Sequence, residues 1–196
     1  MRQPINFICN PECEISVSPD LSKSAELSAD GTKQALAIGQ ALFSHAGEVS
    51  LFTSSEAGAL IASRAIAHTA NIPTSAISSL LNKNTTRANF EVDGKVEVLG
   101  LDEVGLPVYT ELDKQRMLNF YRMVSCDPYN MPTYAVTEKD SITALLNALD
   151  INNKGSEIQP GSITSLVNIY EDRVVAVTTT PKIVGENHGS QDILAA

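Results

Sequence analysis

Short apolar runs alternate with helix-like stretches in the first part of this chain. Residues 5–9 form a mostly apolar run that breaks at Pro11, and a run of this length predicts a buried strand. Farther on, apolar residues recur at the spacing of one helical face. That face consists of Ala35, Ile38, Gly39 and Leu42. Because glycine costs a helix about 1 kcal/mol relative to alanine, Gly39 predicts a close approach to a neighbouring element. Ser28 is the predicted N-cap, with Asp30 in the first turn.

The same alternation continues through the rest of the chain. Strands are predicted at residues 49–53 and 134–137, and helices at 56–70, 114–124 and 141–149. The apolar faces of the three helices are formed by Leu60, Ile61 and Ala65, by Met117, Leu118 and Tyr121, and by Ile142, Leu145, Leu146 and Leu149. Repeated strand–helix units of this kind predict a parallel sheet with right-handed crossovers.

The connecting segments carry weaker signals. Residues 12–26 contain a proline and four serines and are predicted to form a loop. Residues 74–81 fit either a helical turn or a strand-like connection, and residues 82–89 are polar. Seven acidic residues lie between positions 91 and 113, among glycines and a proline. We therefore interpret residues 90–133 as a variable acidic insertion.

The C-terminal part differs from the rest. Residues 163–170 and 174–180 are rich in β-formers and predict an antiparallel hairpin at a sheet edge, and residues 185–196 are expected to form a flexible tail. A chain of 196 residues suits one domain, spanning residues 1–196. The predicted fold class is α/β, a three-layer α/β/α sandwich with a mostly parallel central sheet and an antiparallel edge hairpin near the C-terminus.

Charge and hydropathy narrow the choice of partners. The formal net charge is −9, whereas nonspecific nucleic-acid binding depends on clustered Lys and Arg. We therefore expect no nucleic acid and no membrane as a partner. The opening residues lack the apolar core of a signal peptide, and no apolar span of about 18 residues is present. These features predict a soluble, cytoplasmic protein, and they leave the oligomeric state open.

The cysteines and histidines do not predict a metal or disulfide site. Three cysteines lack a repeated spacing, and the pair Cys9 and Cys13 lacks the second ligand pair that zinc needs. No Lys, Arg or His lies in residues 7–12 to stabilise a thiolate, so both thiols are predicted to be packed and inert. No metal and no cofactor are expected. Surface or capping roles are expected for the histidines, His45, His68 and His188.

The segment that opens the first helix carries a recognisable motif. In residues 27–42, Leu-Ser, Gly, Gln-Ala, Gly and Leu stand at the spacings of the first-helix motif of the histidine phosphatase, or phosphoglycerate mutase-like, superfamily, which the chain resembles. Residues 49–55, 134–146 and 160–164 are similar to later elements of that family. The resemblance implies the same three-layer fold that the hydrophobic pattern predicts.

The resemblance also implies where a catalytic site would lie. In the family a histidine carries the phosphoryl group, two arginines and a second histidine neutralise its oxygens, and an acid protonates the leaving group. Carried over to this chain, the nucleophile position falls on Asn10 and the adjoining arginine on Cys9. The signature glycine becomes Pro11, and only Glu12 keeps its residue type.

The remaining catalytic positions are replaced as well. The arginine that follows Ser-Ser in the family falls on Ala59, and the second histidine on Glu138. An asparagine amide cannot hold a phosphoryl group, and each lost arginine removes charge-assisted hydrogen bonds of about 1.5–3 kcal/mol. The Glu138 carboxylate would repel a phosphate. No catalytic residue is therefore expected at these positions.

Two classes of function follow from this pattern. The first hypothesis is a non-catalytic histidine-phosphatase-like protein, a pseudoenzyme whose remodelled cleft binds or regulates through an unknown protein or small-molecule ligand. Its candidate ligand-binding residues are Asn10, Ser54, Ser55 and Glu138. The alternative is a phosphatase- or hydrolase-like enzyme with altered chemistry that uses Cys9, Glu12 and Glu138. That alternative requires an exposed Cys9 thiol within hydrogen-bond reach of Glu138.

Other charged residues add little to either hypothesis. Glu103 or Glu111 would have to converge with the acidic candidates to form a divalent-cation site, whereas acidic runs of this kind more often form a solvated face. Arg64 and Lys139 are the nearby cations, and neither stands at a matching family position. A shifted alignment that hides a phosphatase site is the third interpretation.

Overall fold

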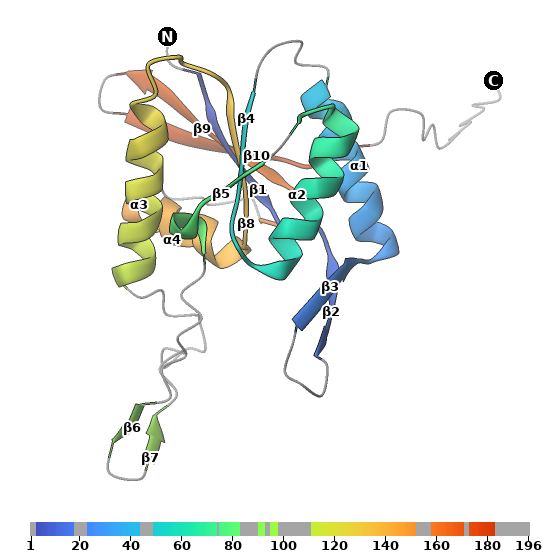
Figure 1. The fold of residues 1–196 in the computed structure, drawn as a ribbon. Coiled ribbons are helices and arrows are strands. Elements are labelled where there is room, and N and C mark those ends of the chain that lie inside the picture. The colour runs from blue at the N-terminus through green and yellow to red at the C-terminus, as the bar shows by residue number, and fades with distance from the viewer. Residues whose placement is uncertain are drawn as a thin grey trace, which may run out of the picture.

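The central sheet has six strands, in the order β10-β9-β1-β8-β4-β5 (Figure 1). The computed structural model describes residues 3–17, 23–43, 49–73, 75–82, 90–92, 95–97, 111–151, 158–170 and 173–182. The strands are β1 (Ile5–Cys9), β4 (Ser50–Thr53), β5 (Ala76–Ile77), β8 (Thr133–Thr137), β9 (Ile163–Tyr170) and β10 (Arg173–Thr179). The first four pair in parallel, and β9 and β10 form an antiparallel hairpin at one edge. The predicted fold class is confirmed.

Helices cover both faces of this sheet in the described part of the chain (Figure 1). They are α1 (Ala29–Phe43), α2 (Ala57–Ala70), α3 (Glu111–Ser125) and α4 (Lys139–Ala148). One hydrophobic cluster joins α1 and α2 to one face of the sheet, and a second joins α3 and α4 to the other. No helix in the described ranges is long and apolar enough to cross a membrane.

Strand β1 supplies side chains to both clusters. Phe7 and Cys9 lie in the cluster with α3 and α4, whereas Ile8 lies in the cluster with α1 and α2. Alternate residues of a strand point to opposite faces, so a strand covered by helices on both sides buries both sets of side chains. This double burial explains why the run at residues 5–9 is mostly apolar. Its polar side chain, Asn6, is buried and donates to the Thr133 carbonyl at 3.2 Å.

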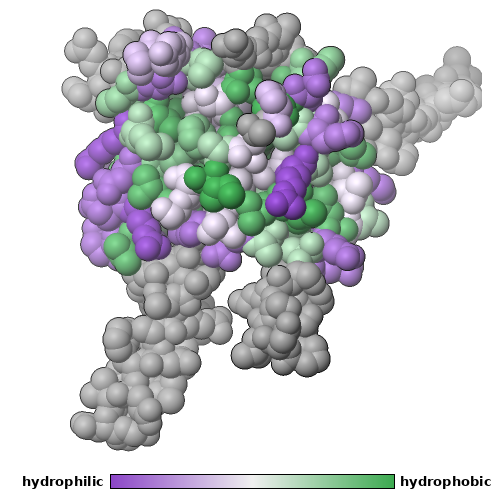
Figure 2. Space-filling view, in the orientation of Figure 1, coloured by the Kyte–Doolittle hydropathy of each residue, from purple (hydrophilic) through white to green (hydrophobic). Residues whose placement is uncertain are grey.

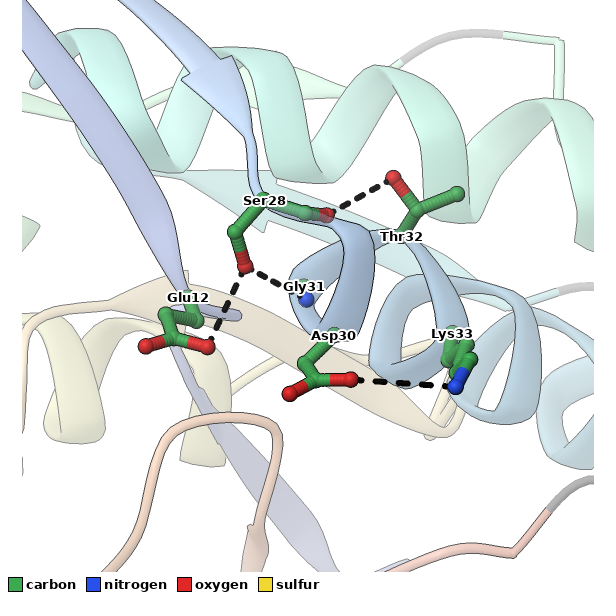
Figure 3. A network of polar contacts seen from close by, with 6 residues as sticks. All are labelled: Glu12, Ser28, Asp30, Gly31, Thr32 and Lys33. Atoms are coloured by element: carbon green, nitrogen blue, oxygen red, sulfur yellow. Dashed lines mark hydrogen bonds and ion pairs between the residues drawn. The ribbon is translucent and has the colours of Figure 1, made fainter.

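The predicted start of α1 is confirmed. The backbone N–H of Gly31 donates to Ser28 Oγ at 2.9 Å, and Thr32 Oγ1 donates to the Ser28 carbonyl at 3.0 Å (Figure 3). The close approach predicted at Gly39 is also present, because a Cβ added there would lie 2.5 Å from Thr69 Cβ on α2. Helices α1 and α2 therefore pack with their backbones near each other.

Two sequence-based expectations are wrong. Residues 12–26 do not form a loop throughout, since β2 (Cys13–Val17) and β3 (Lys23–Leu27) pair as an antiparallel hairpin. The serines lower the β propensity of each strand alone, but contacts between paired side chains across the hairpin stabilise the two strands together. The predicted apolar face of α2 is also displaced. Leu60, Ile61 and Ala65 are only half-buried, and the fully buried hydrophobic positions are Ala59, Ala62 and Ile66.

The middle of the chain is described only in part. The segment expected to be a turn or a strand contains both β5 and a short 3-10 helix, η1 (Ser79–Leu81). Two short strands, β6 (Phe90–Val92) and β7 (Lys95–Glu97), pair with each other. Helix α3 begins three residues earlier than expected, with acidic Glu111 and Asp113 in its first turn, where the helix dipole favours them. Most of the acidic stretch, Glu103 included, and the tail from residue 185 lie outside the described residues.

Candidate functional site

The carboxyl ends of β1 and β8 lie next to each other and bring two sequence-predicted residues together. Cys9 pairs with Thr137 in parallel register, so Asn10 and Glu138 follow at the same edge of the sheet. Asn10 Nδ2 donates to Glu138 Oε1 at 2.8 Å, and the Asn10 backbone N–H donates to the Thr137 carbonyl at 2.9 Å. Open α/β sheets place their sites at this edge. We call Cys9, Asn10, Gly58 and Glu138 the carboxyl-end site.

Helix α2 faces Asn10 with a glycine. A Cβ added at Gly58 would lie 2.8 Å from Asn10 Nδ2 and 3.5 Å from Cys13 Sγ. Ala59, the position expected to stand for the family arginine, is fully buried in the hydrophobic cluster of α1 and α2. The residue of α2 that lies beside Asn10 is therefore Gly58, which has no side chain, rather than Ala59.

Cys9, at the end of β1, and Cys13, at the start of β2, are poor nucleophiles. Cys9 is 3% exposed, and burial followed by the Glu138 charge raises the pKa of its thiol to about 12. Cys13 is half-buried, and its thiol contacts the Pro11 carbonyl at 3.2 Å. Burial, then the charges of Glu138 and Glu12, raises its pKa as well. A protonated thiol does not attack electrophiles, so the site does not favour thiol chemistry at neutral pH.

Glu12 is bound to the start of α1 rather than to Glu138. Its Oε2 accepts a hydrogen bond from Ser28 Oγ at 3.1 Å (Figure 3), and its backbone N–H donates to Gln34 Oε1 at 2.9 Å. Pro11 is buried just before it. The negative charges of Glu12 and Glu138 nevertheless both raise the pKa of the Cys13 thiol, so Cys13 lies in negatively charged surroundings.

The hydroxyls of Ser54 and Ser55 already have partners. Ser54 is fully buried, and its Oγ accepts the Glu56 backbone N–H at 3.4 Å. The Ser55 backbone N–H donates to Asn82 Oδ1 at 2.8 Å, and Ser55 Oγ accepts from Asn82 Nδ2 at 2.7 Å. An anion at the start of α2 would therefore have to displace Asn82. The sequence analysis did not predict this role of Asn82.

The cation nearest to the carboxyl-end site in sequence is Lys139, whose charge partly offsets the rise in the pKa of the Cys9 thiol. Lys139 follows Glu138 and is exposed. Among the described residues, no group of three or more His, Cys, Asp and Glu side chains could hold a metal ion. Glu111 is exposed on α3 and pairs with Lys114 at 3.6 Å, so it does not converge on Glu138.

Two cavities in the described structure lie away from the carboxyl-end site. One, of about 530 Å³, lies near the amino ends of β1 and β8 and includes Gln3, Cys126 and Asn130. The other, of about 550 Å³, lies between α2 and β5 and includes Arg64, His68 and Ile77. His68 is exposed in the last turn of α2, whereas His45 and His188 lie outside the described residues.

Comparisons with known proteins bear on the fold. No protein-family model and no curated protein matches this sequence, but many solved structures are similar. A mycobacterial glucosyl-3-phosphoglycerate phosphatase complexed with VO3 superposes with a TM-score of 0.60 at 14% identity, covering 93% of this chain and 100% of its own. A phosphoserine phosphatase variant from Entamoeba histolytica, in complex with phosphoserine, gives 0.56 at 14% identity, covering 92% and 97%. A protein from Escherichia coli assigned as an alpha-ribazole-5′-P phosphatase gives 0.57 at 14% identity, covering 93% and 97%. These neighbours are histidine-phosphatase-like, or phosphoglycerate mutase-like, proteins, and the chain has their fold.

Proposed function

We propose that this chain is a non-catalytic protein on the histidine phosphatase fold, in which the carboxyl-end site serves binding or regulation. The observation that carries the proposal is the 2.8 Å hydrogen bond from Asn10 Nδ2 to Glu138 Oε1. By the resemblance, these two residues stand where the family has its phosphate-carrying histidine and its second histidine. Here they bind each other.

The chemistry of that pair argues against phosphoryl transfer. An amide nitrogen has its lone pair delocalised into the carbonyl, so Asn10 is no substitute for an imidazole nucleophile. A carboxylate at Glu138 repels phosphate oxygens, and Gly58 brings no guanidinium to offset that repulsion. The ligand of this site is therefore expected to be something other than a phosphate ester.

The alternative hypothesis, an enzyme with altered chemistry, is weakened by the burial of Cys9. It needs an exposed Cys9 thiol beside Glu138, but Cys9 is buried and its pKa lies at about 12. Glu12, the second residue of that hypothesis, is held by Ser28. These features favour the binding role.

Turnover measurements test the proposal. The purified protein is incubated with p-nitrophenyl phosphate, phosphoglycerates and phosphohistidine, alongside an active phosphatase of the same fold. We expect no release of phosphate above the buffer rate. Robust hydrolysis that Asn10→Ala abolishes would overturn the proposal, whereas the matched variant Asn119→Ala, on the exposed side of α3, controls for asparagine loss as such.

A further inference from the structure

The cavity near the amino ends of β1 and β8, here called the amino-end cavity, lies at the edge of the sheet opposite the carboxyl-end site. Its volume is about 530 Å³, which is the size of a small-molecule site. It shares no described lining residue with the carboxyl-end site. In Figure 1 this edge lies at the top, where α3 ends and β1 begins. Figure 2 shows hydrophobic and hydrophilic residues side by side around the upper end of α3.

Part of the lining of the amino-end cavity is apolar. Ile5, at the start of β1, is 7% exposed, and Val124 and Met131 are half-buried. These three side chains come from β1, from the last turn of α3 and from the segment that leads into β8. Small-molecule sites are lined mostly by such side chains, together with a few polar groups that orient the ligand. The cavity therefore suits a ligand with an apolar body.

The polar part of the lining is rich in hydrogen-bond acceptors. Asp127 Oδ1 accepts the Tyr129 backbone N–H at 3.0 Å. Asn130 Oδ1 accepts the Gln3 backbone N–H at 2.9 Å, and Asn168 lines the same cavity. These bonds hold the first two side chains in place, and a carboxylate or amide oxygen can accept more than one hydrogen bond. A ligand that donates hydrogen bonds therefore finds acceptors here.

The electrostatics of the cavity favour a cation. Among the described lining residues, Asp127 is the charged one. Val124 and Ser125 belong to the last turn of α3, where the helix dipole places partial negative charge. Arg122 lies in the same turn, but it is exposed and is not among the described lining residues. The net charge of −9 on the whole chain also attracts cations.

A metal ion is a poorer occupant than an organic cation. Hard metal ions take six or more oxygen ligands, and a described lining with one carboxylate offers them little charge. Among the described residues, no group of three or more His, Cys, Asp and Glu side chains could hold a metal ion. An anionic ligand is disfavoured because the Asp127 carboxylate would repel it.

We propose that the amino-end cavity binds a primary amine with an apolar body. An ammonium group has three N–H donors and no acceptor, so it needs a site made of acceptors. It donates to the Asp127 carboxylate and to the side-chain oxygens of Asn130 and Asn168. The apolar body of the ligand contacts Ile5 and Met131. This site is additional to the binding role proposed for the carboxyl-end site.

Amide chemical shifts in ¹⁵N-labelled protein test this binding. The probe is 2-phenylethylamine. The controls 2-phenylethanol and phenylacetate keep the apolar body without the ammonium group, whereas methylamine keeps the charge without the body. At constant ionic strength we expect saturable shifts of amides between residues 124 and 131 with the probe. Its affinity should exceed that of each control at least about tenfold, because charge-assisted hydrogen bonds and apolar burial act together.

The variant Asp127→Asn tests the charge. It removes the carboxylate but keeps a side-chain oxygen that can accept the Tyr129 N–H, so the local turn is retained. The affinity for 2-phenylethylamine should fall at least about tenfold. The matched variant Asp30→Asn makes the same change at an exposed position in the first turn of α1 and should leave the affinity unchanged.

Cys126 provides an independent measurement. Its thiol is exposed, and Cys126 lines the same cavity. Saturating 2-phenylethylamine should slow the alkylation of Cys126 by iodoacetamide at least about threefold, because an occupied cavity restricts access to the thiolate. Phenylacetate at the same concentration should leave the rate unchanged.

Four results would overturn the proposal. They are equal binding of the three phenyl compounds, equal binding of methylamine and 2-phenylethylamine, the same loss of affinity in Asp127→Asn and Asp30→Asn, and no saturable shift with 2-phenylethylamine together with unchanged alkylation of Cys126. The outcome is independent of the turnover measurements, because none of the cavity residues belongs to the carboxyl-end site.

Discussion

At the scale of single residues, Asn10 decides the character of the carboxyl-end site. Its amide nitrogen is committed to Glu138 at 2.8 Å, and its Oδ1 is buried without a hydrogen-bond partner in the described structure. Rotating the amide would place Oδ1 against the carboxylate, so the observed orientation is the one the charges favour. The pair therefore joins β1 to β8 at the carboxyl edge of the sheet.

Replacing that amide by a second carboxylate tests the pair. In Asn10→Asp two carboxylates meet, which raises the pKa of the pair in the folded state above the unfolded values. Stability is then retained below the unfolded pKa and lost as pH rises through the folded pKa. We expect a loss of about 1–3 kcal/mol in unfolding free energy at pH 7.5 that shrinks at pH 4, measured by urea denaturation.

The control for this prediction is Asn10→Ala. It removes the donor without adding a charge, so its destabilisation should depend much less on pH. Equal pH dependence in the two variants would show that repulsion between carboxylates is not the cause.

Cys9 gives a second prediction at this scale. Burial raises the pKa of its thiol to about 12, so at pH 8 almost none of it is thiolate. Iodoacetamide should modify exposed Cys126 first and Cys9 only after unfolding, as read by mass spectrometry of the peptides. Rapid labelling of Cys9 in the folded protein would contradict the burial described here.

The same raised pKa predicts a dependence of stability on pH. The folded state keeps the thiol proton at a pH where the unfolded state has lost it, so stability is lost as pH rises above the unfolded value towards about 12. Between pH 8 and 10 the unfolding free energy should fall by about 1 kcal/mol more than in Cys9→Ala. A parallel fall in both proteins would refute this.

At the scale of elements, hydrophobic spacing predicted the parts that bury their side chains on a regular period. Strand β1 and helices α1 and α4 follow from it, because their buried positions dominate the local pattern. Helix α3 was located, but its buried residues are Met117 and Phe120, whereas the predicted Leu118 and Tyr121 are half-buried. The position of helix α2 was predicted correctly, but the wrong face was predicted to be buried. Its buried face consists largely of alanines, which are less hydrophobic than Leu60 and Ile61. The hairpin of β2 and β3 was missed because its strands depend on each other rather than on their own composition.

The contact between α1 and α2 provides a prediction for these elements. Gly39→Ala gains about 1 kcal/mol in helix propensity, but its Cβ would lie 2.5 Å from Thr69 Cβ and 3.1 Å from the Ile66 carbonyl. Overpacking should dominate and lower the unfolding free energy by about 1–2 kcal/mol, measured by denaturant titration. Lys33→Ala, on the exposed side of α1, should stay within about 0.5 kcal/mol of the parent. Stabilisation by Gly39→Ala would disprove the tight packing.

At the scale of the whole molecule, the fold is shared with structures of low sequence identity. The similar structures share about one residue in seven with this chain, at 14% identity, yet cover nearly all of it. The buried pattern alone is enough to specify the three layers, because packing tolerates exchange among apolar residues.

The site was predictable only where it follows directly from strand ends. Asn10 and Glu138 meet because β1 and β8 are neighbours in the sheet, whereas the strand–helix repeat predicted only that these strands are parallel. The sequence did not predict that Gly58 lies beside Asn10, because this contact depends on the orientation of the first turn of α2. The next residue, Ala59, points into the core instead. Asn82 was missed because its bond to Ser55 joins segments whose closeness only the folded chain determines.

Phosphate binding tests the central claim most directly. Inorganic phosphate and then vanadate are titrated into ¹⁵N-labelled protein at constant ionic strength, and the amides of Asn10, Gly58 and Glu138 are followed. At concentrations that saturate an active phosphatase of the same fold, these amides should show no saturable shift, because the Asn10 amide already donates to the Glu138 carboxylate and that carboxylate repels an anion. Saturable shifts at these amides that Asn10→Ala removes would contradict the account.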